Sequence, residues 1–151
     1  MTEKTTRILP ARTFAQQLRK LLAEEGYRPR LEQENEDAAT KLHFKVEGHG
    51  FQLRCREEDP DFVQICTGYV LEGATRDELT LLRAANDLQA RLKVVKVWIP
   101  ASTELAEFQM ELFLGGHPLT PELLERCIAM LRHSAGEFWG RVKAEAPLAR
   151  A

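Results

Sequence analysis

Histidine, cysteine and acidic side chains are the residues of this sequence that could bind a metal or carry out acid–base chemistry. No two of the four histidines have the i+4 or HxH spacing that brings two imidazoles onto one metal: His43, His49, His117 and His133. The cysteines form no CxxC pair. We therefore predict no metal site.

The three cysteines allow two interpretations. Cys55 and Cys66 lie in segments that read as neighbouring strands, so one register would place their thiols opposite each other as a redox pair. We favour the second interpretation, in which Cys55, Cys66 and Cys127 are reduced, buried thiols that pack as small apolar side chains. Cys127 lies on the inner face of a predicted helix, where a thiol is core rather than nucleophile.

Motifs for nucleophilic catalysis and for phosphate transfer are missing. The sequence has no GxSxG elbow, and its GHG and GG segments do not form a phosphate-binding loop of the GxxxxGK[ST] type. The acidic segments ENED and REEDPD are typical of solvated loops. We expect no catalytic residue and no cofactor, and hence a protein that is not an enzyme.

The charge balance and the apolar runs exclude further classes. The 151 residues include 21 Lys and Arg and 23 Asp and Glu, which gives no electrostatic footprint for nucleic acid or for an anionic membrane. No apolar run approaches the ~20 residues that cross a bilayer, and the segment MTEKTTRILPARTF lacks the apolar core of a signal peptide. We expect a cytoplasmic protein that contacts neither nucleic acid nor membrane.

The first half of the chain predicts one helix and three strands. Apolar residues at helical spacing predict a helix over 10–25, which Gly26 would end in a left-handed conformation. A polar segment follows, with a short extended piece around Leu31. Alternating apolar and polar residues then predict strands over 42–46, 51–55 and 62–71, with turns at 48–50 and at EDPD.

The segment TRDELTLLRAANDLQARLKVVKVWIP, residues 75–100, predicts a helix that runs into a fourth strand with no Gly or Pro between them. Thr75 and Glu78 have the spacing of a capping box. The inner stripe of this helix is predicted to be Leu79, Leu82, Ala85, Leu88 and Leu92. The β-branched residues before Pro100 are typical of a strand.

The last third predicts a fifth strand over 108–114, in a hairpin with the fourth, and then a helix. Thr120 is the predicted N-cap and Pro121 the first helical residue, with Leu119 and Leu124 spaced as a hydrophobic staple. The chain is thus an α+β protein with a five-stranded antiparallel sheet and helices packed on it. We predict one domain over 10–143, between flexible tails at 1–9 and 144–151.

Asn86 and Gln89 lie beside the apolar stripe at the helix–strand junction. They could belong to a ligand-binding surface. The interpretation that we favour is that their amides satisfy main-chain groups where the helix runs into the strand without a glycine cap.

Four aromatic residues are candidates for a partner or dimer interface. Trp98 and Phe113 have the opposite parity to the buried residues of their strands, and the last helix is apolar over more than one face. One face of that helix could instead cover the second sheet surface. We favour an interface, because exposed apolar patches and aromatic anchors mark interfaces: Trp98, Phe113, Phe138 and Trp139.

Three segments resemble the YbjN family: EEGYRPRLEQE, FKVEGHGFQLRCREEDPDFVQI and NDLQARLKVVKVWI. The last segment is similar to family members in having an Asn at Asn86, a second amide at Gln89 and then Arg91-Leu92 before a strand. It departs from them because Gln89 replaces the more usual Asn, and Val95 stands where a Gly is common.

The resemblance covers roughly Phe14 to Val142 and implies the fold of type III secretion chaperones. The family is described as regulators of bacterial sensory transduction, and its structural relatives are homodimers that hold extended segments of a client. The resemblance thus implies a protein that is not an enzyme.

Our first functional hypothesis is a cytoplasmic regulator that binds a protein partner, by strand addition or in a groove. It would be a homodimer through the fourth and fifth strands or the last helix. The alternatives are a type III secretion-type chaperone that holds an extended client segment, and a small-molecule sensor with a cavity between sheet and helices.

Overall fold

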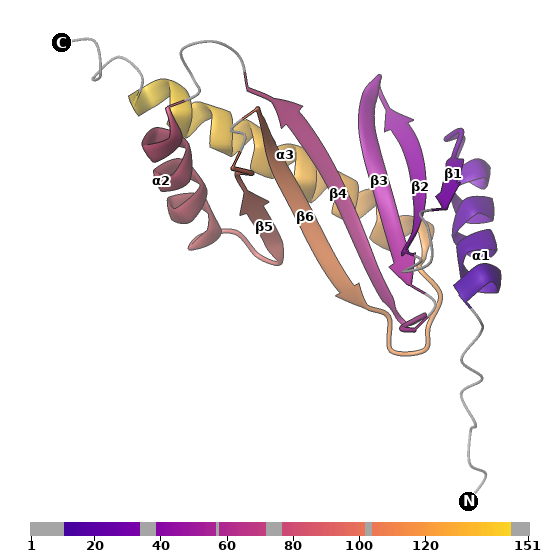
Figure 1. Cartoon of the computed structure of the whole chain (residues 1–151). Helices are drawn as coiled ribbons and strands as arrows, with labels where there is room; N and C mark the ends of the chain where they lie inside the picture. The colour runs from indigo at the N-terminus through magenta and orange to yellow at the C-terminus, as the bar shows by residue number, and fades with distance from the viewer. Residues whose placement is uncertain (1–10, 34–38, 57, 72–76, 102–103, 146–151) are drawn as a thin grey trace, which may run out of the picture. The chain divides into compact units, whose positions relative to one another are not determined.

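The computed structural model describes residues 11–33, 39–56, 58–71, 77–101 and 104–145 (Figure 1). Within these residues the elements follow the predicted order of helix, strands, helix, strands and helix, which confirms the α+β class. They are α1 (Ala11–Glu24), β1 (Arg30–Gln33), β2 (Ala39–Val46), β3 (His49–Arg56), β4 (Phe62–Val70), α2 (Glu78–Gln89), β5 (Val95–Trp98), β6 (Leu105–Phe113) and α3 (Pro121–Glu145).

The strands form one sheet in the order β1-β2-β3-β4-β6-β5. It has six strands rather than the predicted five, because the extended piece around Leu31 pairs with β2 in antiparallel register, Leu31 opposite Leu42. The sequence RLEQ of β1 contains a single apolar residue, so its alternation is too short to mark a strand. β1 is a strand because its backbone pairs with the backbone of β2.

The described residues divide into two compact units. Unit 1 is formed by residues up to Ile65 together with Glu111–Leu124, and unit 2 by Cys66–Met110 together with the residues from Glu125 onward. Strands β4 and β6 and helix α3 each contribute residues to both units. The single domain over 10–143 stays a prediction. The predicted tails lie outside the described residues, except for residues 144–145, which end α3.

The core of unit 1 is built from the apolar faces of α1, β2 and β3. Phe14, Leu18 and Leu22 of α1 are buried, and the ring of Phe44 stacks on that of Phe51 with 5.7 Å between centroids. Gly26 ends α1 with a φ of 86°, as predicted, and the N–H of Tyr27 bonds the carbonyl of Leu22 at 3.0 Å.

The turn between β2 and β3 lies one residue earlier than predicted. Glu47 and Gly48 both have positive φ, 50° and 82°, and Val46 pairs with His49 across them. This is the two-residue turn that matches the twist of a hairpin. Gly50 belongs to β3 instead of to the turn.

Asp61 holds the loop between β6 and α3. Its carboxylate accepts the N–H groups of Gly115 and Gly116, at 3.1 and 2.8 Å, and its carbonyl accepts that of Leu114 at 3.0 Å. Helix α3 then begins at Pro121, and the Thr120 hydroxyl accepts the N–H of Leu123 at 3.2 Å. The predicted N-cap is confirmed.

The core of unit 2 centres on Phe108 of β6 and Phe138 of α3, both fully buried and packed edge to face at 5.6 Å. Tyr69 of β4 packs on the other side of Phe108 at 5.7 Å. Burial of each phenylalanine contributes about 1.5–3 kcal/mol relative to an exposed ring. In this unit the helices therefore pack on the sheet face that carries Phe108.

Helix α2 differs from the prediction at its cap and at its inner face. The N-cap is Asp77, whose carboxylate accepts the N–H of Thr80 at 2.9 Å, and Thr75 lies outside the described residues. The buried residues of α2 are Leu81, Ala84, Ala85 and Leu88. Two members of the predicted stripe, Leu79 and Leu82, are instead about half exposed. Ala85 and Leu88 are buried as predicted, but Leu81 and Ala84 pack inward in place of Leu79 and Leu82.

Candidate functional site

The metal-binding residue types do not cluster in the part of the chain that the structure describes. The described residues contain no cluster of three His, Cys, Asp or Glu side chains that could hold a metal ion. All three cysteines are buried free thiols, and Cys55 lies opposite Thr40 on β2. Burial raises the pKa of the Cys55 thiol to about 11 and also raises the pKa of Cys127, so the reactive thiolate is suppressed at both.

Unit 2 carries most of the exposed apolar surface. Of the seven large apolar side chains that are exposed in the described residues, five belong to this unit, at 45–67% exposure: Val70, Leu79, Leu82, Val94 and Trp98. Trp98 alternates with the buried Val97 and Ile99, so it lies on the sheet face away from Phe108. Contiguous patches of exposed apolar side chains mark interaction surfaces, whereas single exposed ones are common on any protein.

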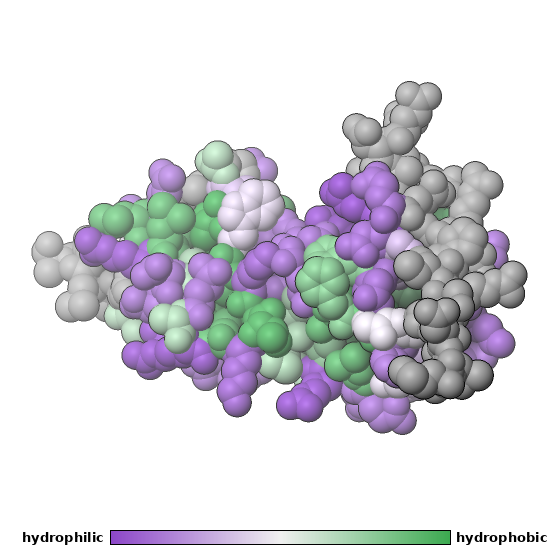
Figure 2. All heavy atoms as spheres, turned by 90° about the horizontal axis from the view of Figure 1, so that it is seen from below, coloured by the Kyte–Doolittle hydropathy of each residue, from purple (hydrophilic) through white to green (hydrophobic). Residues whose placement is uncertain are grey.

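Gly68 contributes no side chain to this face of unit 2. The residue is exposed on β4, and its nearest side-chain neighbour is Leu105 of β6; a Cβ placed on Gly68 would lie 3.8 Å from the Leu105 Cδ1. Figure 2 shows one side of the chain, where apolar side chains gather in separate patches among hydrophilic ones. Apolar and hydrophilic side chains are thus mixed on the side of the chain that Figure 2 shows.

Val94, at the corner between α2 and β5, has a strained backbone. Its φ is 55°, in the left-handed region, which a β-branched side chain rarely adopts. The side chain is also 62% exposed. Neither its conformation nor its burial stabilises the fold, and strain of this kind concentrates at functional positions.

The two junction amides lie at the same corner. The side-chain oxygen of Gln89 accepts the backbone N–H of Val97 at 3.4 Å, which is the role predicted for it. Asn86 is exposed on α2, and its backbone carbonyl accepts the N–H of Ala90 at 3.3 Å. β5 is an edge strand of the sheet. Gln89 therefore accepts a backbone N–H that a further strand would otherwise accept.

The four predicted interface aromatics are placed in different environments. Trp98 in unit 2 and Phe113 in unit 1 are exposed, and Phe113 packs against Phe62 with 5.1 Å between ring centroids. Phe138 lies in the core of unit 2, and the half-buried Trp139 packs edge to face on it at 5.9 Å. Phe138 therefore presents no ring surface to a partner.

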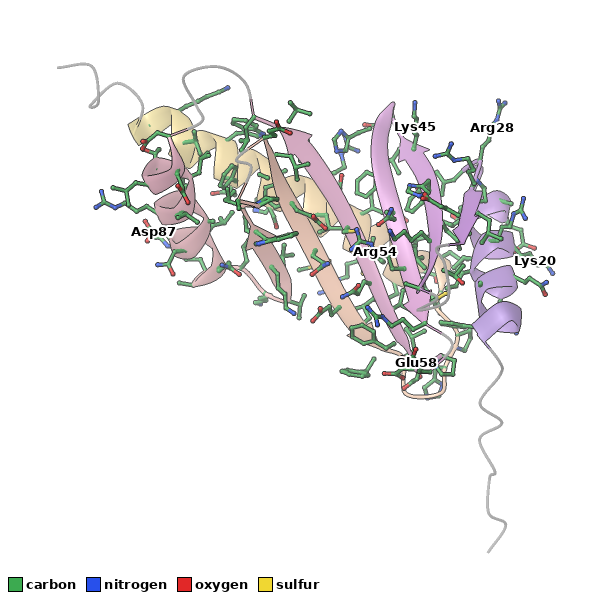
Figure 3. All side chains as sticks on the ribbon, viewed as in Figure 1. Lys20, Arg28, Lys45, Arg54, Glu58 and Asp87 are labelled. Carbon is green, nitrogen blue, oxygen red and sulfur yellow. The ribbon has the colours of Figure 1, made fainter. Side chains whose placement is uncertain are left out.

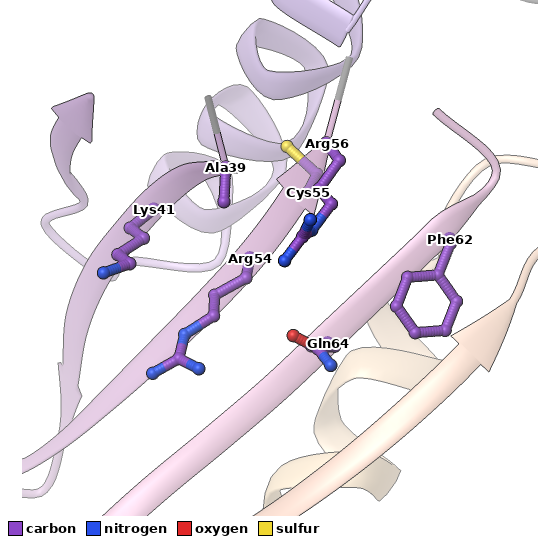
Figure 4. A pocket seen from close by; sticks show the side chains of 7 residues that line it. All are labelled: Ala39, Lys41, Arg54, Cys55, Arg56, Phe62 and Gln64. Carbon is purple, nitrogen blue, oxygen red and sulfur yellow. The ribbon is translucent and has the colours of Figure 1, made fainter. Parts of the chain in front are cut away.

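Unit 1 carries a cationic cavity that the sequence analysis did not identify. Three basic side chains line it, Lys41 of β2 and Arg54 and Arg56 of β3, and Lys41 is the direct cross-strand partner of Arg54. The other lining residues are Ala39, Cys55, Phe62 and Gln64 (Figure 4). Its volume is about 190 Å³. Alternation in the strand patterns indicated that these side chains share a face, but only the register brings them together.

Side-chain contacts position the polar groups around this cavity. Arg54 donates from Nε to the side-chain oxygen of Gln52, whose amide nitrogen lies 3.4 Å from both ring nitrogens of His43. His43 in turn contacts the Glu32 carboxylate on β1. On the other side, Gln64 donates to Glu111 at 2.9 Å. The contacts involve residues of five strands, β1, β2, β3, β4 and β6.

The fold is that of an α+β protein with an antiparallel sheet. Comparison with known proteins identifies it further: the family described as "YbjN: Putative bacterial sensory transduction regulator" matches residues 15–142. The chain belongs to the YbjN family. No curated protein matches the sequence.

The structure is similar to the crystal structure of an uncharacterized protein from Methanothermobacter thermautotrophicus. The TM-score is 0.68 and the sequence identity 14%, over 87% of this chain and 98% of the other. At this identity the likeness shows the fold alone. The further likeness to type III secretion chaperones stays a prediction. No helix in the described part of the chain is long and apolar enough to cross a membrane.

Proposed function

We propose that this YbjN-family protein is a regulator that acts by binding a protein partner, and that it does so as a homodimer. The observation that carries the proposal is the group of exposed apolar side chains in unit 2, above all Trp98, which is 58% exposed. Tryptophan is among the residues most enriched in the energetic centres of interfaces. The family description, a regulator of sensory transduction, agrees with a binding role.

The strained corner supports the same surface. Val94 is both exposed and held in a left-handed conformation, and it lies four residues before Trp98. A contact that covers Val94 would stabilise a conformation that is unfavourable in isolation. Leu79 and Leu82 add exposed apolar surface from α2, in the same unit.

The mode of binding that we propose is packing of side chains against this surface rather than addition of a strand to β5. The strand has only four residues, and the N–H of Val97 is already bonded to Gln89. A strand that added at β5 would have to displace this side chain. The hypothesis of a secretion-type chaperone that holds an extended client segment is therefore less well supported at this edge.

Light scattering after size exclusion tests the homodimer. We expect a mass of twice 17.2 kDa for the wild-type chain and dissociation at lower concentration for Trp98→Ser. Phe113→Ser is the matched control, because it removes an exposed ring from unit 1 and should leave the mass unchanged. A wild-type protein that stays at 17.2 kDa at high concentration would remove the homodimer from the proposal.

Affinity capture from the native lysate tests the partner. We expect proteins that the wild-type chain retains and that Trp98→Ser loses, while Phe113→Ser retains them. Unfolding curves of both variants must match that of the wild type, since both side chains are exposed and neither contributes to a core. If the two variants retain the same proteins as the wild type, unit 2 is not the binding surface.

A further inference from the structure

The connection from α2 to β5 in unit 2 concentrates positive charge. The segment LQARLKVVKVWIPA, residues 88–101, contains Arg91, Lys93 and Lys96 and no acidic residue. Val94 lies next to Lys93 and is exposed, and Trp98 is exposed at the end of β5. We call Arg91, Lys93 and Val94 the basic corner. It joins two exposed cations to an exposed apolar side chain within one short stretch of chain.

Arg91 and Lys93 have no carboxylate partner in the described part of the chain. Both side chains are exposed, and neither forms an ion pair with another described residue. Lys96 differs from them, because it already has an interaction within the chain, and we assign it no role in binding. The charge of the basic corner therefore comes from two residues.

Two acidic residues lie close to this segment and do not pair with the basic corner. Asp87 precedes Arg91 by one helical turn, and Figure 3 shows it on the side of α2 that points away from β5. Glu107 lies directly opposite Trp98 in the β5·β6 register, and it has an interaction within the chain. Neither forms an ion pair with Arg91 or Lys93. The two cations can therefore take a carboxylate from another chain.

The end of α2 accounts for only one of these cations. The partial negative charge at the C-terminus of a helix attracts positive side chains, and this attraction fades within one turn. Arg91 directly follows the C-cap Ala90 and benefits from it, whereas Lys93 lies beyond this range. The fold gains little from Val94 either, because its side chain is exposed and its backbone is strained. A cation and an apolar side chain that contribute little to the fold are suited to contact with a partner.

We propose that the basic corner binds an acidic segment of the partner protein, in which carboxylates pair with Arg91 and Lys93 and an apolar side chain packs on Val94. This inference rests on the proposed function, because it names the chemistry of the partner that binds unit 2. A guanidinium can donate two parallel hydrogen bonds to one carboxylate, and an ammonium pairs as a point charge. Complementary charge across an interface raises the association rate and disfavours wrong partners. The basic corner thus selects among proteins that could all cover Trp98.

Fluorescence anisotropy of labelled peptides, with the full wild-type chain, tests the proposal. A short peptide that contains Glu and Leu is compared with a peptide in which Gln replaces every Glu. We expect the acidic peptide to bind about tenfold more tightly than the neutral one, since two exposed ion pairs contribute up to about fivefold each. The difference should shrink as sodium chloride is added, because salt screens exposed charges.

Arg91→Gln and Lys93→Gln should each weaken binding of the acidic peptide about threefold, and the double variant should weaken it about tenfold. Lys143→Gln is the matched control. Lys143 is an exposed cation in the last turn of α3, also in unit 2, and its loss removes the same unit of charge. At constant ionic strength this control should lose less than about twofold in affinity. All three residues are exposed, and a thermal unfolding curve confirms that each variant is folded.

Four results would overturn the inference. Equal affinity for the two peptides, or no binding of either, would exclude the acidic preference, while the proposed function would still be decided by affinity capture with Trp98→Ser. An equal loss in Lys143→Gln and Arg91→Gln would mean diffuse attraction. Phosphatidylserine vesicles that bind the wild type and not the double variant, without binding of the acidic peptide, would assign the basic corner to a membrane surface. A lower mass of the double variant in light scattering would assign it to a contact between two copies of the chain.

Discussion

The two units of the chain differ in the residues that lie between the buried residues of their strands. In both, strands alternate between mostly buried apolar residues and more exposed residues. The residues between them differ: unit 1 presents Lys41, Arg54 and Arg56, whereas unit 2 presents Trp98 and Val70. The buried set defines the fold in each case. Function therefore has to be sought in the intervening set, which is basic in this part of unit 1 and apolar in unit 2.

The units also differ in how the backbone of an irregular segment is stabilised. In unit 1 the carboxylate of Asp61 bonds two glycine N–H groups of one loop. In unit 2 the corner at Val94 has the unfavourable left-handed conformation. Unit 1 also holds a non-glycine residue, Glu47, at positive φ in a hairpin turn, whereas the residue at positive φ in unit 2 is β-branched.

The largest effect is expected from the two aromatic cores. Phe138→Ala in unit 2 and Phe44→Ala in unit 1 should each lower the free energy of unfolding by about 3–5 kcal/mol, because each leaves a cavity in a buried core. We expect one cooperative transition in both variants, since β4, β6 and α3 have residues in both units. Chemical denaturation followed by fluorescence and by circular dichroism measures this. Two separate transitions would show that the units unfold independently.

A smaller loss is expected at the loop of unit 1. Asp61→Ala removes both side-chain acceptors from Gly115 and Gly116 and should cost about 1–2 kcal/mol of unfolding free energy, since these bonds are charge-assisted but exposed. Asp61→Asn keeps one acceptor oxygen and should lose less. Urea denaturation of the three proteins provides the comparison. Equal stability of Asp61→Ala and wild type would exclude a structural role for this carboxylate.

The opposite sign is expected at the corner of unit 2. Val94→Gly should raise the free energy of unfolding by about 0.5–1 kcal/mol, because glycine adopts a positive φ without strain. Val94→Ala keeps a Cβ and should gain little. If this surface binds a partner, Val94→Gly should at the same time weaken the binding, which light scattering and affinity capture detect. A destabilised Val94→Gly would contradict the strain.

The smallest effect concerns the cap of α2 in unit 2. The hydrogen bonds from Thr80 hold the pKa of the Asp77 carboxyl below its ordinary value. This stabilisation is present above about pH 3.8 and is lost as the pH falls through the lowered pKa of the folded state. The melting temperature of Asp77→Ala should therefore lie below that of the wild type at pH 6, and the difference should shrink at pH 3. A difference that is independent of pH would mean that the charge contributes nothing.

The sequence predicted the helices and most strands because their apolar periods are long and regular. It placed β2, β3 and β4 from alternation, and it located the start of α3 from Thr120 and Pro121. It missed β1, whose four residues carry too little pattern. It placed the inner face of α2 only in part: Ala85 and Leu88 are buried as predicted, whereas Leu81 and Ala84 are buried in place of Leu79 and Leu82.

The candidate sites were predictable to different extents. Trp98 and Phe113 could be recognised as exposed, since parity along a strand assigns each residue to a face. Phe138 could not be assigned, because a helix with two apolar faces does not reveal which one is buried. The cationic cavity was out of reach as well: Lys41 and Arg54 are 13 residues apart in sequence, and only the register of β2 with β3 makes them neighbours.

The bond from Val97 to Gln89 has a consequence for the behaviour of the protein in solution. A sheet that ends in an open row of donors and acceptors recruits other chains into fibres, and natural proteins block such rows with side chains or charges. Here one glutamine blocks the row, with Lys96 beside it. Gln89→Ala should therefore make concentrated samples aggregate faster than the wild type, measured as turbidity, even if the melting temperature is unchanged.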